Sequence, residues 1–445
     1  MNIVLLSGGS GKRLWPLSND IRSKQFINIF KSKNKTYESM VQRVFGQIKR
    51  VDNDAEITIA TSKSQVSTLH HQLGDDISIC VEPTRRDTFP AIALVAAYLH
   101  DVKHVSKNNA IVVCPVDPYV EDEYFGALKV LETLAENGSS NLVLMGIEPT
   151  YPSEKYGYII PEDDSTISKV DSFKEKPNEE TAKKYIEQGA LWNSGVFAFK
   201  LEYLLNKAHE LIDFADYEDL YNKYDQLEKI SFDYAVVEKE SDISVMHFGG
   251  EWKDLGTWNT LTESMEENVI GRGILDETNS DVNIINELNI PILAMGLKDV
   301  VISASPDGIL VSNKERSSQM KPYVEKIKQR VMYAEKSWGK FQVIDVEDKS
   351  LTILVSLNAN HSMNYHSHEH RQETWTIVSG EGSVLLDGVE RKVTEGDVIS
   401  IETGVKHTLK AITDLKAIEV QMGKNISVKD KKKYQLIKQK GQEDE

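Results

Sequence analysis

The chain has few cysteines and no long apolar run. Only Cys80 and Cys114 occur among 445 residues, and both lie inside apolar stretches, where cysteine is usually a small buried hydrophobic residue. A disulfide framework and a cysteine-based zinc site are therefore excluded. The longest apolar stretch, residues 91–99, is far too short to cross a bilayer. Because the first residues carry no basic leader and their apolar run ends at Leu6, we expect a first strand, no signal peptide and a cytoplasmic protein.

Basic residues are also in the minority. The chain has 52 Lys and Arg residues against 69 Asp and Glu residues, which gives a formal net charge of -17. Such an anionic surface repels phosphate backbones and anionic lipids unless basic groups are concentrated locally. We therefore expect neither nucleic acid nor a membrane as a partner. The length, with 40% hydrophobic and 27% charged residues, indicates two or three globular domains and excludes a disordered or fibrous chain.

The first 262 residues alternate short β-branched runs with helix-like segments. Runs at 3–6, 57–60, 77–81, 110–114 and 142–146 are expected to be strands. The alternation predicts an α/β domain with a Rossmann-like, mostly parallel sheet and helices on both faces. Residues 90–100 predict a buried helix that opens with a proline.

The pattern changes twice further along the chain. Residues 263–330 predict a small β-rich connector, with strands such as 301–303 and 309–311 and one longer helix at 320–331. Residues 331–425 contain closely spaced β-like runs joined by Gly-rich turns, which is typical of a small antiparallel barrel or sandwich. Residues 426–445 are rich in charge and are expected to form a solvated tail.

A glycine-rich loop follows the first strand. Residues 7–16 read SGGSGKRLWP and lie at the carboxyl end of a parallel strand, where open α/β sheets bind ligands. Glycine amides can approach a polyphosphate closely, and the two cations can neutralise it. Neither a dinucleotide fingerprint nor a Walker loop fits, because Leu14 replaces the third glycine and Arg13 replaces the Ser or Thr after Lys12. Taken alone, the loop is equally compatible with an ordinary tight turn.

The continuation of this loop is more specific. Gly8-Gly9-x-Gly11-x-Arg13-Leu-Trp-Pro, followed by Lys24-Gln25-Phe26, resembles the signature of the sugar-1-phosphate nucleotidylyltransferases, and within them the mannose-1-phosphate guanylyltransferases. The likeness recurs along almost the entire chain, in Glu82-Pro83-x-x-Arg86-x-Thr88-x-Pro90, Pro115-x-Asp117, Gly157-Tyr158, Glu175-Lys176-Pro177, Trp192-Asn193-Ser194-Gly195, Phe232-Asp233-Tyr234-Ala235 and Trp252-x-Asp254-x-Gly256-x-Trp258. The carboxyl part resembles the cupin domain of the fused type II mannose-6-phosphate isomerases.

This resemblance implies transfer of GMP from GTP to a sugar 1-phosphate, with mannose 1-phosphate as the first choice, to give a GDP-sugar and pyrophosphate. Such a transfer aligns two polyanions and needs no covalent protein nucleophile. Mg²⁺ prefers carboxylate oxygens, and the resemblance implies that Asp117 and Asp254 hold it, although a lone aspartate is more often a turn or helix cap. The implied catalytic residues are Arg13, Lys24, Asp117, Lys176 and Asp254.

The resemblance also assigns the two substrates. Lys176 would meet the sugar phosphate, and the sugar would be bound by Gly157, Glu175 and Asn193, although such residues are also common in ordinary loops. Glu82 and Arg86 would lie near the base, or form a simple loop ion pair. The implied nucleotide-binding residues are Gly8, Gly9, Gly11, Lys12, Arg13, Glu82 and Arg86.

The barrel region contains a metal-site pattern, His366-x-His368-x4-Glu373-x6-Gly380, with His407 later. On a strand His366 and His368 project to one face, so two imidazoles, the carboxylate of Glu373 and a third imidazole can enclose a divalent transition metal such as Zn, Mn, Fe or Co. His370 shares the same strand parity, and the choice of His366, His368, Glu373 and His407 follows cupin spacing. Without a metal, this would be a histidine-rich exposed loop.

Several positions depart from the family pattern. Ser23 replaces the proline expected before Lys24, and residues 85–87 and 115–118 replace Gly-Arg-Asn and Pro-Ser-Asp-His types, so another sugar or nucleotide stays open. In the barrel, His366 stands where glutamine is usual, and a lysine-rich tail replaces a segment ending in Arg-x-x-Asp-x-Tyr-Gly.

No base for aldose–ketose isomerisation can be assigned from the sequence. Isomerase activity therefore stays an alternative, beside a protein that is chiefly a cupin isomerase or epimerase, and beside a non-catalytic sugar-nucleotide sensor. We expect GTP and a sugar 1-phosphate as ligands, and a homo-oligomer.

Overall fold

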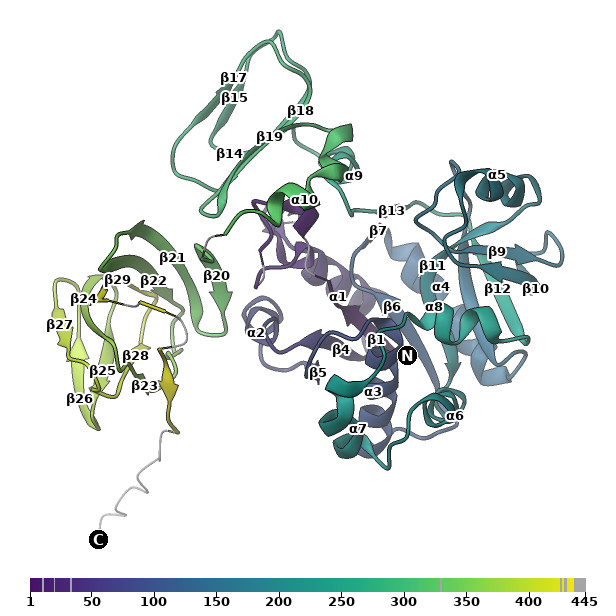
Figure 1. Cartoon of the computed structure of the whole chain (residues 1–445), viewed down its shortest axis with the longest axis horizontal. Helices are drawn as coiled ribbons and strands as arrows, with labels where there is room; N and C mark the ends of the chain where they lie inside the picture. The colour runs from purple at the N-terminus through teal and green to yellow at the C-terminus, as the bar shows by residue number, and fades with distance from the viewer. Residues whose placement is uncertain are drawn as a thin grey trace.

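The computed structural model describes residues 1–9, 12–19, 21–32, 34–328, 330–424, 426–427 and 430–435, with the side chain of Lys12 excepted. It shows three regions, namely an α/β domain, a β connector and a C-terminal barrel (Figure 1). None of the helices in these ranges combines the length and the apolar content that a membrane crossing needs.

The α/β domain is built on a nine-stranded sheet in the order β5-β4-β1-β6-β11-β8-β12-β10-β9. The central strand β1 (Asn2–Ser7) pairs in parallel with β4 (Glu56–Ser62) and β6 (Ala110–Pro115). The others are β5 (Ser78–Glu82), β8 (Leu142–Ile147), β9 (Tyr158–Pro161), β10 (Ile167–Lys174), β11 (Leu191–Lys200) and β12 (Ile243–Phe248). β11 runs antiparallel to β6 and β8. The five predicted strands are confirmed.

Helices cover both faces of this sheet, as predicted (Figure 1). α1 (Met40–Val51) and α4 (Asp122–Asn137) pack in one apolar core, and α3 (Thr88–Asp101) and α6 (Leu201–Leu211) pack in the other. The predicted helix at 90–100 is confirmed within α3, which is buried along most of its length. Smaller helices are α2 (Val66–Leu73), α5 (Glu179–Glu187), α7 (Tyr217–Lys223), α8 (Phe232–Ala235) and α9 (Trp258–Glu263).

The connector consists of short strands that pair mostly in parallel. β14 (Val269–Gly271), β16 (Ser280–Asn286) and β18 (Lys298–Ser305) lie side by side in parallel, and β15 (Gly273–Leu275) pairs in parallel with β17 (Ile292–Ala294). β19 (Gly308–Asn313) closes the larger sheet in antiparallel fashion. The predicted β-rich character is confirmed.

The helix predicted at 320–331 is wrong in length. A 3-10 helix covers Glu315–Gln319, and α10 covers only Lys321–Val324. Val324 packs against the core of the α/β domain, whereas Ile327 is 43% exposed. A short helix needs a packed apolar face, and here that face ends with Val324.

The C-terminal region is an antiparallel barrel, as predicted. One sheet has the order β20-β21-β22-β29-β24-β27 and the other β26-β25-β28-β23-β30. Alternate residues of β22 (Ser350–Leu357) are buried, which is the pattern of a strand with one face on a core. The remaining strands are β20 (Tyr333–Lys336), β21 (Gly339–Val346), β23 (His366–Ser367), β24 (Arg371–Ser379), β25 (Gly382–Leu386), β26 (Val389–Val393), β27 (Val398–Ile401), β28 (His407–Ala411), β29 (Leu415–Gly423) and β30 (Lys432–Lys433).

Within the tail predicted from residue 426, the side chains of Lys432 and Lys433 are exposed, as a solvated tail requires, but their backbone forms a strand. Lys432 and Lys433 form β30, which pairs with β23. The amide of Tyr434 donates to the carbonyl of Tyr365 at 2.9 Å. The free edge of β23 offers backbone groups that the tail satisfies, so a charged sequence becomes a strand. Residues 436–445 lie outside the described residues.

Candidate functional site

A cleft of about 650 Å³ opens at the carboxyl ends of the central parallel strands. This is where the sheet topology places ligands. Of the residues predicted for the transferase site, those that line it are Gly8, Gly9, Glu82, Asp117, Gly157, Glu175, Lys176, Asn193 and Asp254. The structure therefore brings together residues separated by more than half of the chain.

Two carboxylates of this cleft converge on Lys24, which is not itself among the described residues that line the cleft. Asp117 follows β6, and Asp254 ends β13 (Trp252–Asp254), which pairs with β7 (Pro118–Val120) so that Asp254 lies opposite Pro118. The Nζ of Lys24 is 2.6 Å from Oδ2 of Asp117 and 3.6 Å from Oδ1 of Asp254. Burial lowers the pKa of Lys24, but the two carboxylates outweigh burial and hold this pKa above its usual value.

The same two carboxylates suit Mg²⁺. They are 34% and 38% exposed, so each has a face toward the cleft as well as a partner in the protein. Two hard oxygen donors with an open side fit an ion that keeps several of its waters. Gly256 leaves room for this arrangement, because a Cβ there would lie 3.1 Å from Oδ2 of Asp254. Asp117 and Asp254 would hold the ion.

The glycine-rich loop is described in part. Gly8 and Gly9 line the cleft, and Gly9 has a φ of 95°, which favours glycine. Arg13 is in the 3-10 helix Lys12–Leu14 and is exposed, and it is not among the described residues that line the cleft. Gly11 and the side chain of Lys12 lie outside the described part of the chain.

Glu82 lies at the end of β5, on another wall of the cleft. The Tyr224 hydroxyl donates to its carboxylate at 3.0 Å. Burial raises the pKa of Glu82, and Tyr224 and Arg85 oppose this rise. Arg85 lines the cleft, whereas Arg86 is half-buried and is not among the described lining residues. The structure therefore places Arg85 in the cleft with Glu82, whereas the sequence predicted Arg86.

A second cation and carboxylate pair, Lys176 and Glu175, lies in the cleft. Glu175 is buried, and the ammonium of Lys176 hydrogen-bonds its carboxylate. Burial lowers the pKa of Lys176, but Glu175 outweighs it and the pKa is raised. Gly157 is required here, because a Cβ would lie 2.5 Å from Oε2 of Glu175. Asn193 donates its Nδ2 to Oδ1 of Asp233 at 2.7 Å.

Asp233 is a cleft residue that the sequence placed in a motif without assigning it a role. Burial, followed by the charge of Glu175, raises its pKa from 3.8 to about 7. Its burial depends on how α8 docks beside β11, and the sequence of the motif does not contain this information. Asp233 therefore adds to the cleft a carboxyl group that changes charge near neutral pH.

Replacing Asp233 by asparagine should remove a pH dependence of stability. A carboxyl group with a raised pKa stabilises the fold fully at acid pH, and this contribution is lost as the pH rises through the folded-state pKa. Between about pH 5 and about pH 8, we expect the free energy of unfolding of the parent to fall by about 2 kcal/mol relative to D233N. Urea unfolding at a series of pH values measures this difference.

Asp219 provides the matched control for this prediction. Its pKa is lowered by Lys223, so it titrates below this pH window. D219N should follow the pH profile of the parent. Parallel profiles for the parent and D233N would show that Asp233 is ionised throughout.

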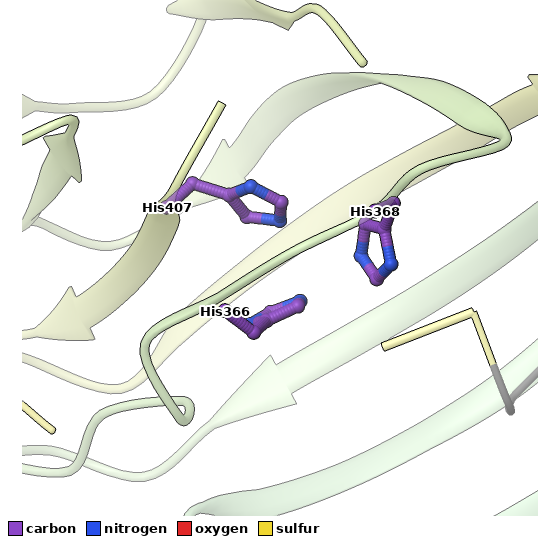
Figure 2. Close-up of side chains that lie close together, drawn as sticks. All are labelled: His366, His368 and His407. Carbon is purple, nitrogen blue, oxygen red and sulfur yellow. The ribbon is translucent and has the colours of Figure 1, made fainter. Parts of the chain in front are cut away.

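The barrel places three histidines together. His366 on β23 lies opposite His407 on β28, and the ligand atoms of His366, His368 and His407 are all within 4.8 Å of one another (Figure 2). All three residues are buried. His370 is exposed and is not a member of this group among the described residues. Among His366, His368 and His370, the sequence predicted His366 and His368 as ligands, and this geometry agrees with that choice.

Backbone carbonyls fix the orientation of these rings. Nδ1 of His366 lies 2.5 Å from the carbonyl of Asn364, and Nδ1 of His407 lies 2.9 Å from that of Val405. Nδ1 of His368 hydrogen-bonds the carbonyl of Asp430. An Nδ1–H that donates to a carbonyl makes Nε2 the available ligand atom. Nε2 of His368 lies 3.1 Å from Nη2 of Arg371. Nε2 of His407 is buried without a hydrogen-bond partner among the described residues.

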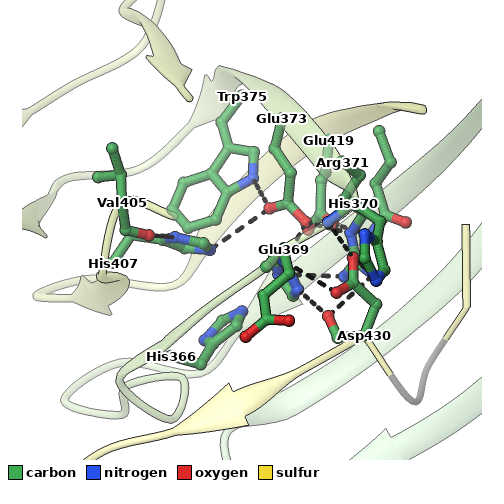
Figure 3. A network of polar contacts seen from close by, with 12 residues as sticks. His366, Glu369, His370, Arg371, Glu373, Trp375, Val405, His407, Glu419 and Asp430 are labelled. Atoms are coloured by element: carbon green, nitrogen blue, oxygen red, sulfur yellow. Dashed lines mark hydrogen bonds and ion pairs between the residues drawn. The ribbon is translucent and has the colours of Figure 1, made fainter. Parts of the chain in front are cut away.

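Glu373 lies beside this group, although it is not one of the three residues whose ligand atoms are all within 4.8 Å of one another among the described residues. Its Oε1 is 3.0 Å from Nε2 of His368, and its Oε2 is 3.5 Å from Nε2 of His407. Arg371 and Trp375 hold the carboxylate, with donors at 2.9 and 3.1 Å (Figure 3). Three imidazoles and one carboxylate fit a divalent transition metal. Arg371 and Asp430 are supporting residues that the sequence did not single out.

Each half of the molecule thus has a distinct chemistry. Two lysines paired with carboxylates, Lys24 and Lys176, lie at the cleft, and lysine ammonium groups suit phosphates. The barrel adds a group of three buried histidines that could hold a metal ion. The fold and the sites together define an α/β enzyme class that acts on phosphorylated nucleotides and sugars, joined to a cupin.

Comparison with known proteins places the chain more closely. The family model described as nucleotidyl transferase matches residues 2–269, and the model of the mannose-6-phosphate isomerase C-terminal domain matches residues 324–435. The chain belongs to the nucleotidyl transferase family and carries a C-terminal domain of the mannose-6-phosphate isomerase type.

The chain is also similar to curated relatives over nearly its full length and to a solved structure. The xanthan biosynthesis protein XanB of Xanthomonas campestris is 31% identical over 96% of each chain. The mannose-1-phosphate guanylyltransferase of Salmonella montevideo is 29% identical over 94% of this chain and 95% of the relative. A crystal structure from Thermus thermophilus, described as a mannose-1-phosphate geranyltransferase, is 26% identical with a TM-score of 0.60, covering 73% of this chain and 98% of that one.

Proposed function

We propose that the chain transfers GMP from GTP to a sugar 1-phosphate, in the first place mannose 1-phosphate, and releases pyrophosphate. The convergence of Asp117 and Asp254 on Lys24, beside the glycine-rich loop, carries this proposal. The names of the full-length relatives support mannose 1-phosphate and guanine as the preferred groups.

Different residues of the cleft would bind the nucleotide and the sugar phosphate. Backbone amides of Gly8 and Gly9 and the ammonium of Lys24 would bind the triphosphate and neutralise its charge. Lys176 would bind the sugar phosphate, and Asn193, with its amide fixed by Asp233, would face the sugar. Glu82 would accept a hydrogen bond from the base. Bound Mg²⁺ would supply positive charge to the phosphates during transfer.

A panel of nucleoside triphosphates against sugar 1-phosphates tests this function by pyrophosphate release. We expect the highest kcat/KM for GTP with mannose 1-phosphate. A clear preference for another pair would reassign the substrates. Tight binding without pyrophosphate release from any pair would instead indicate a sugar-nucleotide sensor.

The barrel favours a second activity, the isomerisation of mannose 6-phosphate. The buried group His366, His368, Glu373 and His407 supports it, together with the match to the isomerase C-terminal family. Protein stripped of transition metal should lose this activity and keep Mg²⁺-dependent transfer. Isomerisation by the stripped protein would exclude the barrel metal from the reaction.

We also propose a cytoplasmic homo-oligomer that binds neither nucleic acid nor membranes. The net charge of -17 supports the last two points. The edge strand β19, whose Ile309 and Val311 are 60% and 64% exposed, supports self-association. A mass of 50.2 kDa by light scattering would identify a monomer and contradict the oligomer.

A further inference from the structure

A buried polar network lies under the glycine-rich loop, and the proposed chemistry does not use it. Ser7, Ser23, Gln25, Thr61 and Gln65 are each at most 1% exposed. They come from the end of β1, the segment around the 3-10 helix Lys24–Phe26, the end of β4 and the residue before α2. Polar side chains so deeply buried are costly unless each is hydrogen-bonded. The network must therefore satisfy a specific group.

That group is the carbonyl of Gly9. The hydroxyl of Ser23 donates to it at 2.9 Å and accepts from Nε2 of Gln65 at 2.6 Å. Oε1 of Gln65 in turn accepts from the hydroxyl of Thr61 at 2.7 Å. A carbonyl oxygen can only accept a hydrogen bond, so the Ser23 hydroxyl must donate to Gly9. Ser23 then accepts from Gln65, and Gln65 accepts from Thr61.

Two details indicate a role for Ser23 beyond local structure. Ser23 precedes the 3-10 helix Lys24–Phe26, where a serine would ordinarily cap the helix, yet its side chain makes no capping bond. It also directly precedes Lys24, whose ammonium lies between Asp117 and Asp254. One hydroxyl therefore connects the loop that lines the cleft to the backbone that carries the lysine.

We propose that Ser23 and Gln65 are positioning residues for the nucleotide. By binding the Gly9 carbonyl from inside the protein, they turn its oxygen away from the cleft, where it would repel a polyphosphate. They also fix the distance between this loop and Lys24. Ser23, which replaces the proline of the family pattern, thus contributes to nucleotide binding. This inference rests on the proposed transfer from GTP.

The experiment compares S23A and Q65M with S244A. Ser244 is the matched control, because it is buried in the same domain and its hydroxyl bonds Ser140 at 2.6 Å, on a different part of the sheet. We expect S23A and Q65M each to raise KM for GTP and the calorimetric Kd for GTP about tenfold. KM for mannose 1-phosphate should stay within about twofold of the parent. S244A should change neither constant, even if it lowers thermal stability equally.

The double variant S23A/Q65M adds a further test. Because both residues act on one carbonyl, its effect on KM for GTP should not exceed the larger single effect. The proposal is wrong if both single variants keep KM for GTP within about twofold of the parent, or if both substrates are affected equally. A parent that releases no pyrophosphate would contradict the proposed function instead, and calorimetric GTP binding by the same variants would still decide the positioning role.

Discussion

The variant D117N is expected to transfer GMP at least about a hundredfold more slowly than the parent, measured as kcat from pyrophosphate release. The substitution would keep the size of the side chain but remove the charge that Asp117 shares with Lys24 at 2.6 Å. The variant would lack one of the two carboxylates suited to Mg²⁺, and it would leave Lys24 with Asp254 alone. Loss of charge at the phosphate-binding centre should act on the transition state more than on GTP affinity.

Asp122 supplies the matched control for D117N. It lies five residues further along in the same domain, and its carboxylate binds Arg50 at the surface, at 2.8 and 3.1 Å. D122N should transfer GMP at the rate of the parent. If D117N retained most of the parental kcat, Asp117 would have no part in the reaction.

The second large effect concerns the barrel. H368A should reduce the transition metal bound after dialysis from about one ion per chain to nearly none, measured by elemental analysis. His368 is buried between the carbonyl of Asp430 and the carboxylate of Glu373, so its Nε2 points into the ligand group. Removing one of four ligands leaves a set too weak to retain the ion during dialysis.

His370 is the control that the chain itself offers. It stands two residues further along, it is exposed, and its amide donates to Asp430 at 3.1 Å. H370A should bind as much metal as the parent. Both variants should keep GMP transfer, because the barrel ligands are outside the cleft. Full metal content in H368A, or loss of metal in H370A, would overturn the ligand assignment.

Much of this architecture could be predicted from local patterns. β-branched runs identified β1, β4, β5, β6 and β8, because buried parallel strands are apolar along their length. Period-two geometry places His366, His368 and His370 on one face, so the choice of His366 and His368 needed the cupin resemblance as well as the spacing. Asp117 and Asp254 were paired by family likeness, and their proximity depends on the pairing of β7 with β13.

Other features depend on contacts that no local pattern contains. Whether Arg85 or Arg86 lines the cleft depends on the conformation of the segment that follows β5. The raised pKa of Asp233 depends on burial beside Glu175. The strand at Lys432–Lys433 depends on the free edge of β23, which the charged tail alone does not reveal. In each case the local sequence indicated the kind of side chain, and the tertiary structure decided its position.

The segment from Arg22 to Phe26 touches all three regions of the molecule. Arg22, 4% exposed, binds Glu287 of the connector at 2.9 Å, and its guanidinium lies 5.2 Å from the ring centre of Tyr333 in the barrel. Gln72 donates both to the carbonyl of Phe26 at 3.0 Å and to Glu335 of the barrel at 2.7 Å. Lys24 is in the middle of this segment.

Arg22, two residues before Lys24, is thus held by Glu287 of the connector, which is synthesised after the residues of the cleft. A fragment ending before the connector would carry every residue of the cleft but would lack Glu287, the counter-charge of Arg22. The segment that carries Lys24 therefore depends on contacts from outside the transferase half.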